Sequence, residues 1–318
     1  MDAGRALQGD GWRRVSSQAV GSCQQAHRAD YRDTSATMNV IGRGLSTTTL
    51  GRESIQAPEV ILEVFSSSVI RARYTERQLS WWPVLAFLPA RMVFSFASQG
   101  IATAFFYVGG SADPVGRAAE TWLVHTTIAD ILCLTVLVLL LRREGLRLRQ
   151  LFGTTRSEGI RQLRWTPVYL LLVAPGAVAA HLITTAFYGS QLPPMISIVD
   201  LSPAGVSYAL LIWPLVWVIT EQFVYLGYLL PRMEALTGRT WLAVIIIVFF
   251  WGLQHVAIPF IGDTTYLVSR ALAATAAVSL FPLVFVLGRR RLVPLIGAHY
   301  IADLSTAFLA AAMPLLAK

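Results

Sequence analysis

Four ionisable residues lie inside long apolar runs in the C-terminal half of the chain: Glu221, His255, His299 and Asp303. A charged side chain at the centre of a bilayer costs about 2.5–3.5 kcal/mol on insertion scales, so residues of this kind are candidates for function. His299 and Asp303 are four residues apart, which places them on one face of a helix. Any one of these residues alone could simply satisfy a neighbour within a helix bundle. Four of them in three apolar segments favour a shared site.

A glutamate and two histidines have the chemistry that activates a water molecule. Apolar surroundings disfavour the charged form of a carboxylate, which makes Glu221 a stronger base. The second histidine and a neighbouring polar side chain could then stabilise a tetrahedral oxyanion. Trp251 precedes His255 by four residues and is expected to form a wall of the same cavity.

The same residues could also bind zinc, because two histidines and two carboxylates are sufficient ligands. The sequence contains no His-Glu-x-x-His pair, however, and no histidine lies one helical turn from Glu221. We therefore predict a site that works without a metal ion, and we expect no other cofactor.

Other polar residues at membrane depth are interpreted as structural. His125 and Asp130 are five residues apart and do not share a helix face. His181 stands alone in its apolar segment, and Arg270 lies near the end of another, where its charge can reach the interface. Cys133 is interpreted as a small core residue.

The apolar segments themselves predict an all-α, polytopic transmembrane helix bundle. A hydrocarbon core of roughly 30 Å needs about 20 residues of helix, and seven segments meet this length. An eighth span is expected if 81–109 holds a re-entrant piece as well as a helix. Trp81 and Trp82 form an interfacial belt before the first segment, and Arg91 is expected at its edge. The segments cover about 86–109, 119–141, 166–188, 206–230, 240–260, 264–287 and 292–314.

Basic residues are concentrated in every second loop, as the positive-inside rule requires. The alternate loops are poor in them, since 110–118 contains only Arg117 and neither 189–205 nor 261–263 contains any. This alternation places the N-terminus in the cytoplasm. The basic loops contain Arg142, Arg143, Arg147, Arg149, Arg156, Arg161 and Arg164, then Arg232 and Arg239, then Arg289, Arg290 and Arg291.

The composition agrees with a membrane protein. Of the 318 residues, 55% are hydrophobic and 14% are charged, whereas a soluble domain has about 25% charged residues. Topology explains the net charge of +8 better than nucleic-acid binding does, because the basic residues fall between apolar runs. Cys23 and Cys133 match no disulfide or zinc spacing. Residues 1–80 are polar, contain no run of spanning length and are predicted to form a mostly disordered cytosolic tail before a transmembrane domain at 81–318.

The order of the motifs resembles the CPBP family, which comprises CAAX prenyl proteases and bacteriocin-processing enzymes and is also called the Abi family. Glu221 precedes a Gly-Tyr-Leu-Leu-Pro-Arg stretch at 227–232, an aromatic-x-x-x-His motif ends at His255, and a His-x-x-x-Asp motif begins at His299. The motifs are 34 (255 − 221) and 44 (299 − 255) residues apart, which places them on separate helices. The resemblance covers about 205–312, which would be the catalytic core.

The resemblance implies a glutamate-type intramembrane endopeptidase that acts on a peptide or membrane-protein substrate, with or without a lipid anchor. Glu221 would be the general base, and His255 would help it polarise the attacking water. His299 and Asp303 would stabilise the oxyanion, with Asp303 where Asn is common. The implied location is a bacterial inner membrane, and no metal is required.

Two positions depart from the family's first motif, Glu-Glu-x-x-x-Arg. Gln222 stands in place of the second Glu, and Leu226 stands in place of the Arg. The missing Glu and Arg are interpreted as a supporting ion pair. Their joint loss is either compensated elsewhere or the mark of a member that binds without cutting.

Two other functions therefore stay open. The first is a non-catalytic immunity or chaperone-like binding protein on the same scaffold. The second is a small transporter that uses Glu221 and the histidines as a proton relay, although the sequence has no internal repeat of the kind that marks many transporters.

Overall fold

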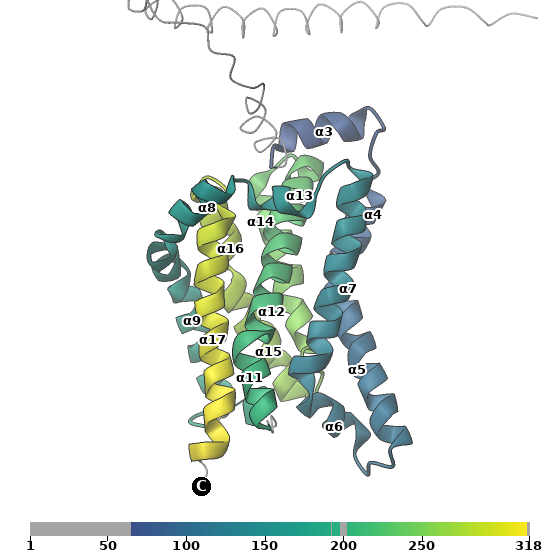
Figure 1. Ribbon diagram of the computed structural model, residues 1–318, viewed down its shortest axis with the longest axis vertical. Helices are drawn as coiled ribbons and strands as arrows, with labels where there is room; N and C mark the ends of the chain where they lie inside the picture. The colour runs from purple at the N-terminus through teal and green to yellow at the C-terminus, as the bar shows by residue number, and fades with distance from the viewer. Residues whose placement is uncertain (1–64, 192, 198–201, 317–318) are drawn as a thin grey trace, which may run out of the picture. The chain divides into compact units, whose positions relative to one another are not determined.

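The computed structural model describes residues 65–191, 193–197 and 202–316, and every regular element in these ranges is a helix (Figure 1). The predicted all-α class is therefore confirmed. Helix α3 (Ser67–Thr75) falls inside the segment 1–80 that was predicted to be a tail, and Arg71 Nε on it donates to the Ala235 carbonyl at 2.9 Å. Residues 1–64, which include Cys23, lie outside the described residues, so the domain boundary at 80 stays a prediction.

The other helices follow in chain order, and the short 3₁₀ and π segments among them are labelled η. They are α4 (Trp82–Phe87), α5 (Ala90–Val108), α6 (Pro114–Glu120), α7 (Trp122–Arg143), η1 (Leu148–Phe152), α8 (Arg156–Leu163), α9 (Thr166–Tyr188), α10 (Pro194–Ser197), α11 (Pro203–Leu211), α12 (Trp213–Glu221), η2 (Gln222–Leu229), α13 (Leu230–Thr237), α14 (Thr240–Leu253), η3 (Gln254–Ala257), α15 (Thr264–Val278), α16 (Leu280–Leu287) and α17 (Leu292–Leu316).

Within the described ranges, five helices are long and apolar enough to cross a membrane, and they match the second to sixth predicted segments. The predicted count of seven or eight is not confirmed. The first predicted segment forms α5, whose buried Arg91, Ser95, Ser98 and Gln99 make it less apolar than its neighbours. The last forms α17, where the apolar helix Leu292–Phe308 is shorter. The five helices are Trp122–Arg143, Thr166–Tyr188, Pro203–Thr237, Thr240–Ala257 and Thr264–Leu287.

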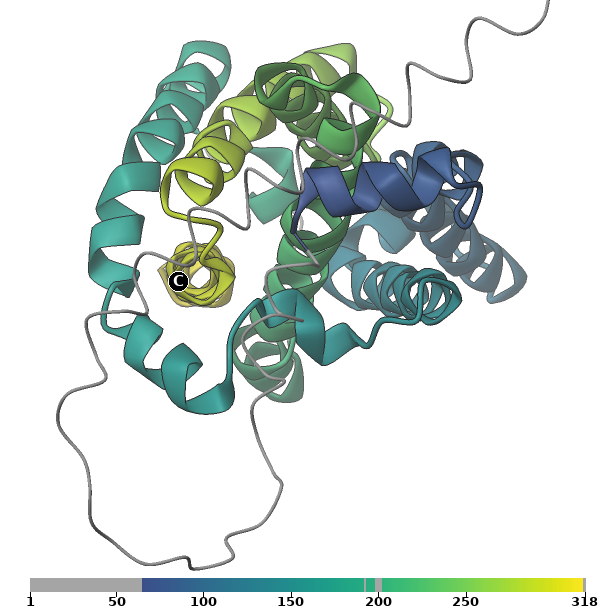
Figure 2. The same ribbon diagram turned by 90° about the horizontal axis from the view of Figure 1, so that it is seen from above.

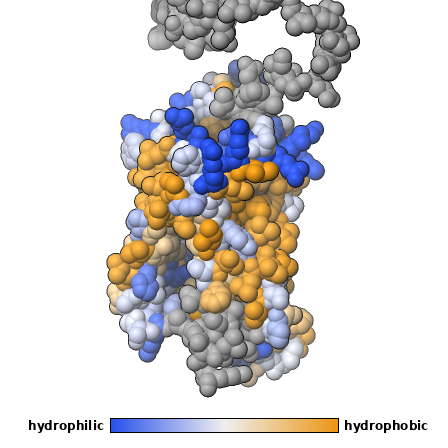
Figure 3. All heavy atoms as spheres, turned by 60° about the vertical axis from the view of Figure 1, so that its left-hand side comes forward, coloured by the Kyte–Doolittle hydropathy of each residue, from blue (hydrophilic) through white to orange (hydrophobic). Residues whose placement is uncertain are grey.

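Apolar side chains cover the surface at mid-height (Figure 3). On α9 and α16, Leu171 is 73% exposed, Leu182 63% and Leu287 73%. Soluble monomers rarely expose apolar surface on this scale. Hydrophilic side chains gather above this band in Figure 3. The surface and the helices together indicate an integral membrane protein.

The connections that follow α7, α13 and α16 lie at one end of the bundle (Figure 1). Arg290 Nη2 on the last of them contacts Glu234 Oε2 of α13 at 2.5 Å. This grouping agrees with the predicted alternation of basic loops. Arg232, however, was predicted to be a loop residue and is instead fully buried in α13, where it pairs with Glu144.

The run from α11 to α13 supplies the centre of the bundle. It contacts α7 on one side and α17 on another, and α17 in turn contacts α9 (Figure 2). Among the five candidate spans this run is the most enclosed, with 67% of its apolar window buried. Glu221 on this run is fully buried and is therefore shielded from lipid.

Candidate active site

Glu221 is the last residue of α12, and the eight residues after it form the π-helical segment η2. A π segment inside a longer helix is frequently found at functional sites, because the wider turn changes where side chains point. Glu221 is fully buried. The carboxylate is thus placed where the regular helix of the central run is interrupted.

The two oxygens of the Glu221 carboxylate have different surroundings. Oε1 accepts from Arg91 Nη1 at 2.5 Å and from Gln254 Nε2 at 2.6 Å. Oε2 has no hydrogen-bond partner among the described residues and lies 3.5 Å from His299 Nε2. One oxygen is therefore held by two donors, whereas the other faces His299.

His255 reaches the site from the turn of 3₁₀ helix η3, because α14 ends at Leu253. Its Nδ1 lies 2.9 Å from the Trp251 carbonyl oxygen. A carbonyl oxygen only accepts, so Nδ1 carries the hydrogen and Nε2 of the neutral ring has a free lone pair. That Nε2 lies 3.7 Å from Glu221 Oε1, which is close but beyond a direct hydrogen bond.

His299 on α17 has the opposite arrangement. Its Nδ1 lies 3.1 Å from the amide nitrogen of Gln222. The amide nitrogen donates, so Nδ1 accepts and the neutral ring carries its hydrogen on Nε2. This Nε2 lies 3.5 Å from both Glu221 Oε2 and Asp303 Oδ2. Gln222 therefore selects the tautomer that directs an N–H group toward the two carboxylates.

Asp303 lies one turn after His299, as the spacing of four predicts, and the exposed fraction of its side chain is 17%. Its Oδ2 has no hydrogen-bond partner among the described residues. An ionised carboxylate only accepts hydrogen bonds, so in this form Asp303 cannot donate to an oxyanion. The geometry suits a different task, which is to orient the His299 ring through Nε2.

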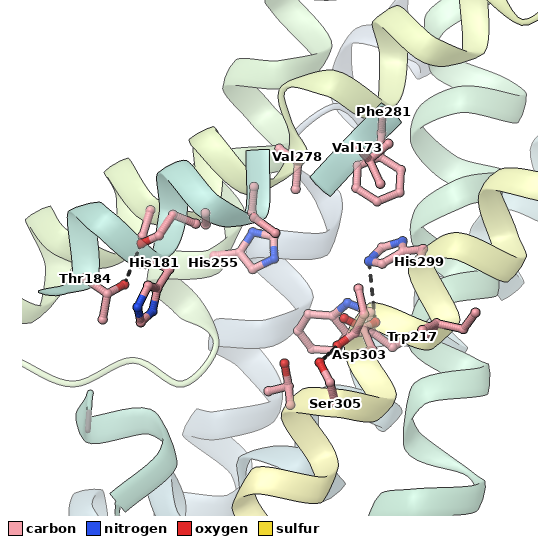
Figure 4. A pocket seen from close by; sticks show the side chains of 18 of the residues that line it. Val173, His181, Thr184, Trp217, His255, Val278, Phe281, His299, Asp303 and Ser305 are labelled. Carbon is pink, nitrogen blue, oxygen red and sulfur yellow. Dashed lines mark hydrogen bonds and ion pairs between the residues drawn. The ribbon is translucent and has the colours of Figure 1, made fainter. Parts of the chain in front are cut away.

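A cavity of about 510 Å³ opens beside these residues between α9, α15 and α17 (Figure 4). His255, His299 and Asp303 face it, whereas Glu221 is not among the residues that line it. The two histidines thus separate the cavity from the buried carboxylate. Small side chains, including Ala177 on α9, form much of the remaining wall.

Trp217 and Phe281 provide the aromatic wall of the cavity. The Phe281 ring centroid lies 4.8 Å from that of His299, and the Trp217 centroid lies 5.9 Å from that of His255. Trp251 was expected in this wall, but it is fully buried and stacks on Tyr225 with centroids 5.1 Å apart. Trp251 therefore packs against the site from the protein core and does not line the cavity.

His181 and Arg270 were interpreted as structural, yet both line the cavity. Figure 4 shows His181 on the side of the view where His255 lies, away from His299. Arg270 Nη2 donates to the Ile258 carbonyl at 3.4 Å, close to the turn that carries His255. Their place in the wall makes them candidates for substrate contact.

Two further site residues were not identified from the sequence. Arg91 was expected at a membrane edge and Asp130 was interpreted as structural, but the structure joins them. Arg91 Nε and Nη2 donate to Asp130 Oδ1 and Oδ2 at 2.5 and 3.2 Å, and the guanidinium lies 4.1 Å above the Trp217 ring. The sequence did contain a signal for this pair, because Arg91 and Asp130 are opposite charges at membrane depth in neighbouring apolar segments. His125, by contrast, is buried on α7 without a hydrogen-bond partner for either ring nitrogen among the described residues.

No group of three His, Cys, Asp or Glu side chains in the described part of the chain is arranged to hold a metal ion. His299 Nε2 lies 3.5 Å from one oxygen of each of its two carboxylate neighbours. Metal independence of the reaction stays a prediction.

Residues 203–305 match the family model described as type II CAAX prenyl endopeptidase Rce1-like. The matched segment contains Glu221, His255, His299 and Asp303, whereas Arg91 lies outside it. No curated protein and no solved structure matches the chain significantly. The match confirms the resemblance inferred from the motifs. The chain thus contains, in its C-terminal third, a segment similar to the Rce1-like type II CAAX prenyl endopeptidases.

Proposed function

We propose that the protein is an intramembrane endopeptidase that hydrolyses a peptide bond with water activated by Glu221. One observation carries this proposal. The buried carboxylate has Oε1 held by two donors, while Oε2 is unpartnered and faces the histidine that borders the cavity. A base needs a free lone pair in a fixed position, and Oε2 has both properties.

The attacking water would bind beside the carboxylate and the imidazoles. The two Nε2 atoms lie 3.5 and 3.7 Å from the Glu221 oxygens, so neither is held by a short direct hydrogen bond to the carboxylate and each can contact a water. In the proposed reaction the water forms a hydrogen bond to the lone pair on His255 Nε2 with one hydrogen. It transfers the other, as a proton, to Oε2 of Glu221. Its oxygen then attacks the carbonyl carbon of the substrate.

His299 would stabilise the oxyanion that forms. Its Nε2–H is directed toward the cavity side of the carboxylate and can donate to the substrate oxygen as negative charge develops. Asp303 would hold the ring in this orientation. When the C–N bond breaks, Glu221 returns its proton to the leaving nitrogen, which balances the reaction.

The cavity would bind the peptide. Its mostly apolar lining suits a membrane-inserted segment, and the family description points to CAAX prenyl proteins as one source of such substrates. We infer a peptide or protein substrate, with or without a lipid anchor. We further propose that α5 and α17 also cross the bilayer, giving seven spans, and that the basic end faces the cytoplasm of a bacterial inner membrane.

The test compares protein termini in membranes that contain the native protein, the Glu221→Gln variant or neither. A precursor that accumulates without the gene and with Glu221→Gln, but is cut by the native protein, would support hydrolysis and name the substrate. If Glu221→Gln and His255→Ala both restore the normal phenotype, hydrolysis is contradicted. That result would favour the non-catalytic immunity or chaperone-like binding protein. Proton-coupled uptake into liposomes that both variants abolish, with unchanged termini, would favour the transporter.

A further inference from the structure

Arg91 and Asp130 form a buried ion pair whose free edge points at the proposed base. Asp130 accepts from Nε and Nη2 of the guanidinium, and this leaves Nη1 for Glu221 Oε1 at 2.5 Å. Arg91 is 1% exposed, and Asp130 and Glu221 are fully buried. The three charges thus come from three helices, α5, α7 and α12, and meet where no lipid or solvent reaches them.

The guanidinium is fixed in orientation as well as in place. Two parallel contacts to one carboxylate define its plane, and the Trp217 ring lies 4.1 Å below it. A lysine could supply the charge but not this planar geometry. The arrangement therefore sets the direction from which Oε1 is held, and consequently the direction in which Oε2 points.

The central run does not supply these charges itself. Positions 222 and 226, which carry Glu and Arg in the family motif, hold Gln222 and Leu226 here. Gln222 uses its amide on His299, and Leu226 is fully buried in the apolar core. Among the described residues, Arg91 on α5 is the arginine that forms an ion pair with Glu221.

We propose that Arg91 and Asp130 replace the missing Glu and Arg of the first motif and position Glu221 as the base; this inference rests on the function proposed above. Neither residue lines the cavity, so neither contacts the substrate. They are positioning residues that act through Glu221. On this account the departures at 222 and 226 are compensated from other helices, and the chain is an active enzyme.

Loss of the pair should lower kcat and leave KM unchanged, because the cavity wall stays intact while the base is misplaced. A misplacement of about 1 Å can cost on the order of 100-fold in rate. We expect that loss for Arg91→Met and a smaller one for Arg91→Lys, which keeps the charge. Arg91→Met leaves two buried carboxylates without a cation, which destabilises the fold. The double variant Arg91→Met/Asp130→Asn removes one of these charges and should be less destabilised.

A second measurement does not depend on turnover. Dicyclohexylcarbodiimide reacts with protonated carboxyl groups in apolar sites, and mass spectrometry can read its attachment to Glu221. The positive charge of Arg91 disfavours protonation of the adjacent Glu221 carboxylate, so its removal should speed the reaction. We expect Arg91→Met and the double variant to label Glu221 faster than the native protein does.

The matched control is Arg232→Met, because Arg232 is equally buried and pairs with Glu144 outside the site. The experiment uses the full chain in detergent and an internally quenched peptide that carries the cleavage site found by comparing termini. Reduced kcat at constant KM together with faster labelling, in the Arg91 variants and not in the control, is the expected result. Unchanged kcat and labelling would overturn the positioning role. If the Arg91 variants label Glu221 faster but the native protein cuts no substrate, the proposed function is overturned while the positioning role of the ion pair stands.

Discussion

Gln222 Nε2 lies 3.1 Å from His299 Nδ1, so the residue that replaces the family's second glutamate contacts the histidine of the third motif. This contact decides which nitrogen of His299 carries the hydrogen. Gln222→Leu should remove that control and lower kcat on the order of 100-fold, the usual contribution of a positioned proton donor. Gln222→Glu should keep activity, because a carboxylate at this position would favour a ring protonated on both nitrogens. Initial-rate kinetics on the quenched peptide check both, and equal loss in the two variants would refute the tautomer argument.

Asp303 should be replaceable by asparagine. The ionised carboxylate can only accept from His299 Nε2, 3.5 Å away, whereas an amide can also donate to an oxyanion. We therefore expect Asp303→Asn to be at least as active as the native protein and Asp303→Leu to lose activity. A kcat that falls equally in both would show that the negative charge itself is required.

Arg232 and Glu144 should support stability rather than catalysis. Arg232 Nε donates to Glu144 Oε1 at 3.0 Å, and Tyr228 OH donates to the same oxygen at 2.9 Å. Arg232→Met leaves a buried carboxylate unpaired, which costs about 3–5 kcal/mol of unfolding free energy. Thermal unfolding in detergent measures the loss. The kcat of the molecules that remain folded should match that of the native protein, and a selective fall in kcat would assign the pair to the site.

Gly252 allows α14 to approach α15 just before the turn that carries His255. A Cβ at this position would lie 2.1 Å from Thr275 Oγ1 and 2.7 Å from Thr275 Cα. Gly252→Ala should therefore displace the turn, destabilise the fold by about 1–3 kcal/mol and reduce kcat. Gly100→Ala on α5 is the control, since no atom lies within 4 Å of its added Cβ. If both alanine variants behave alike, the close approach does not position His255.

Chelation should leave cleavage unchanged. The Glu221 and His299 groups are held by Arg91, Gln254 and Gln222 rather than arranged around a common centre. We expect 1,10-phenanthroline to have no effect beyond that of its non-chelating isomer 1,7-phenanthroline. Inhibition by the first alone, reversed by added zinc, would replace the proposed water activation with a metal-assisted reaction.

Much of the candidate site could be predicted from the sequence because ionisable residues at membrane depth are costly and therefore conspicuous. Glu221, His255, His299 and Asp303 stand out for this reason. Arg91 carries the same signal, but its place near the start of an apolar segment suggested an interfacial position. The structure instead buries it, because Asp130 of α7 and Trp217 and Glu221 of α12 lie against its guanidinium.

Helical spacing was informative only where the helix is regular. It placed Asp303 one turn from His299 correctly, because α17 is continuous between them. It failed for Trp251 and His255, because α14 ends at Leu253 and the turn of 3₁₀ helix that follows rotates His255 away from the tryptophan's face.

The sequence by itself determined the helical class, the apolar spans and the acid and histidines buried among them, because these depend on composition and on spacing along one chain. Only the tertiary structure decided the partners. Arg91 and Asp130 meet Glu221 from helices that begin far from it in the chain, and their meeting depends on how α5, α7 and α12 pack. Periodicity identifies the face of one helix but not the helix it faces, so an ion pair between distant segments becomes visible only when the bundle is assembled.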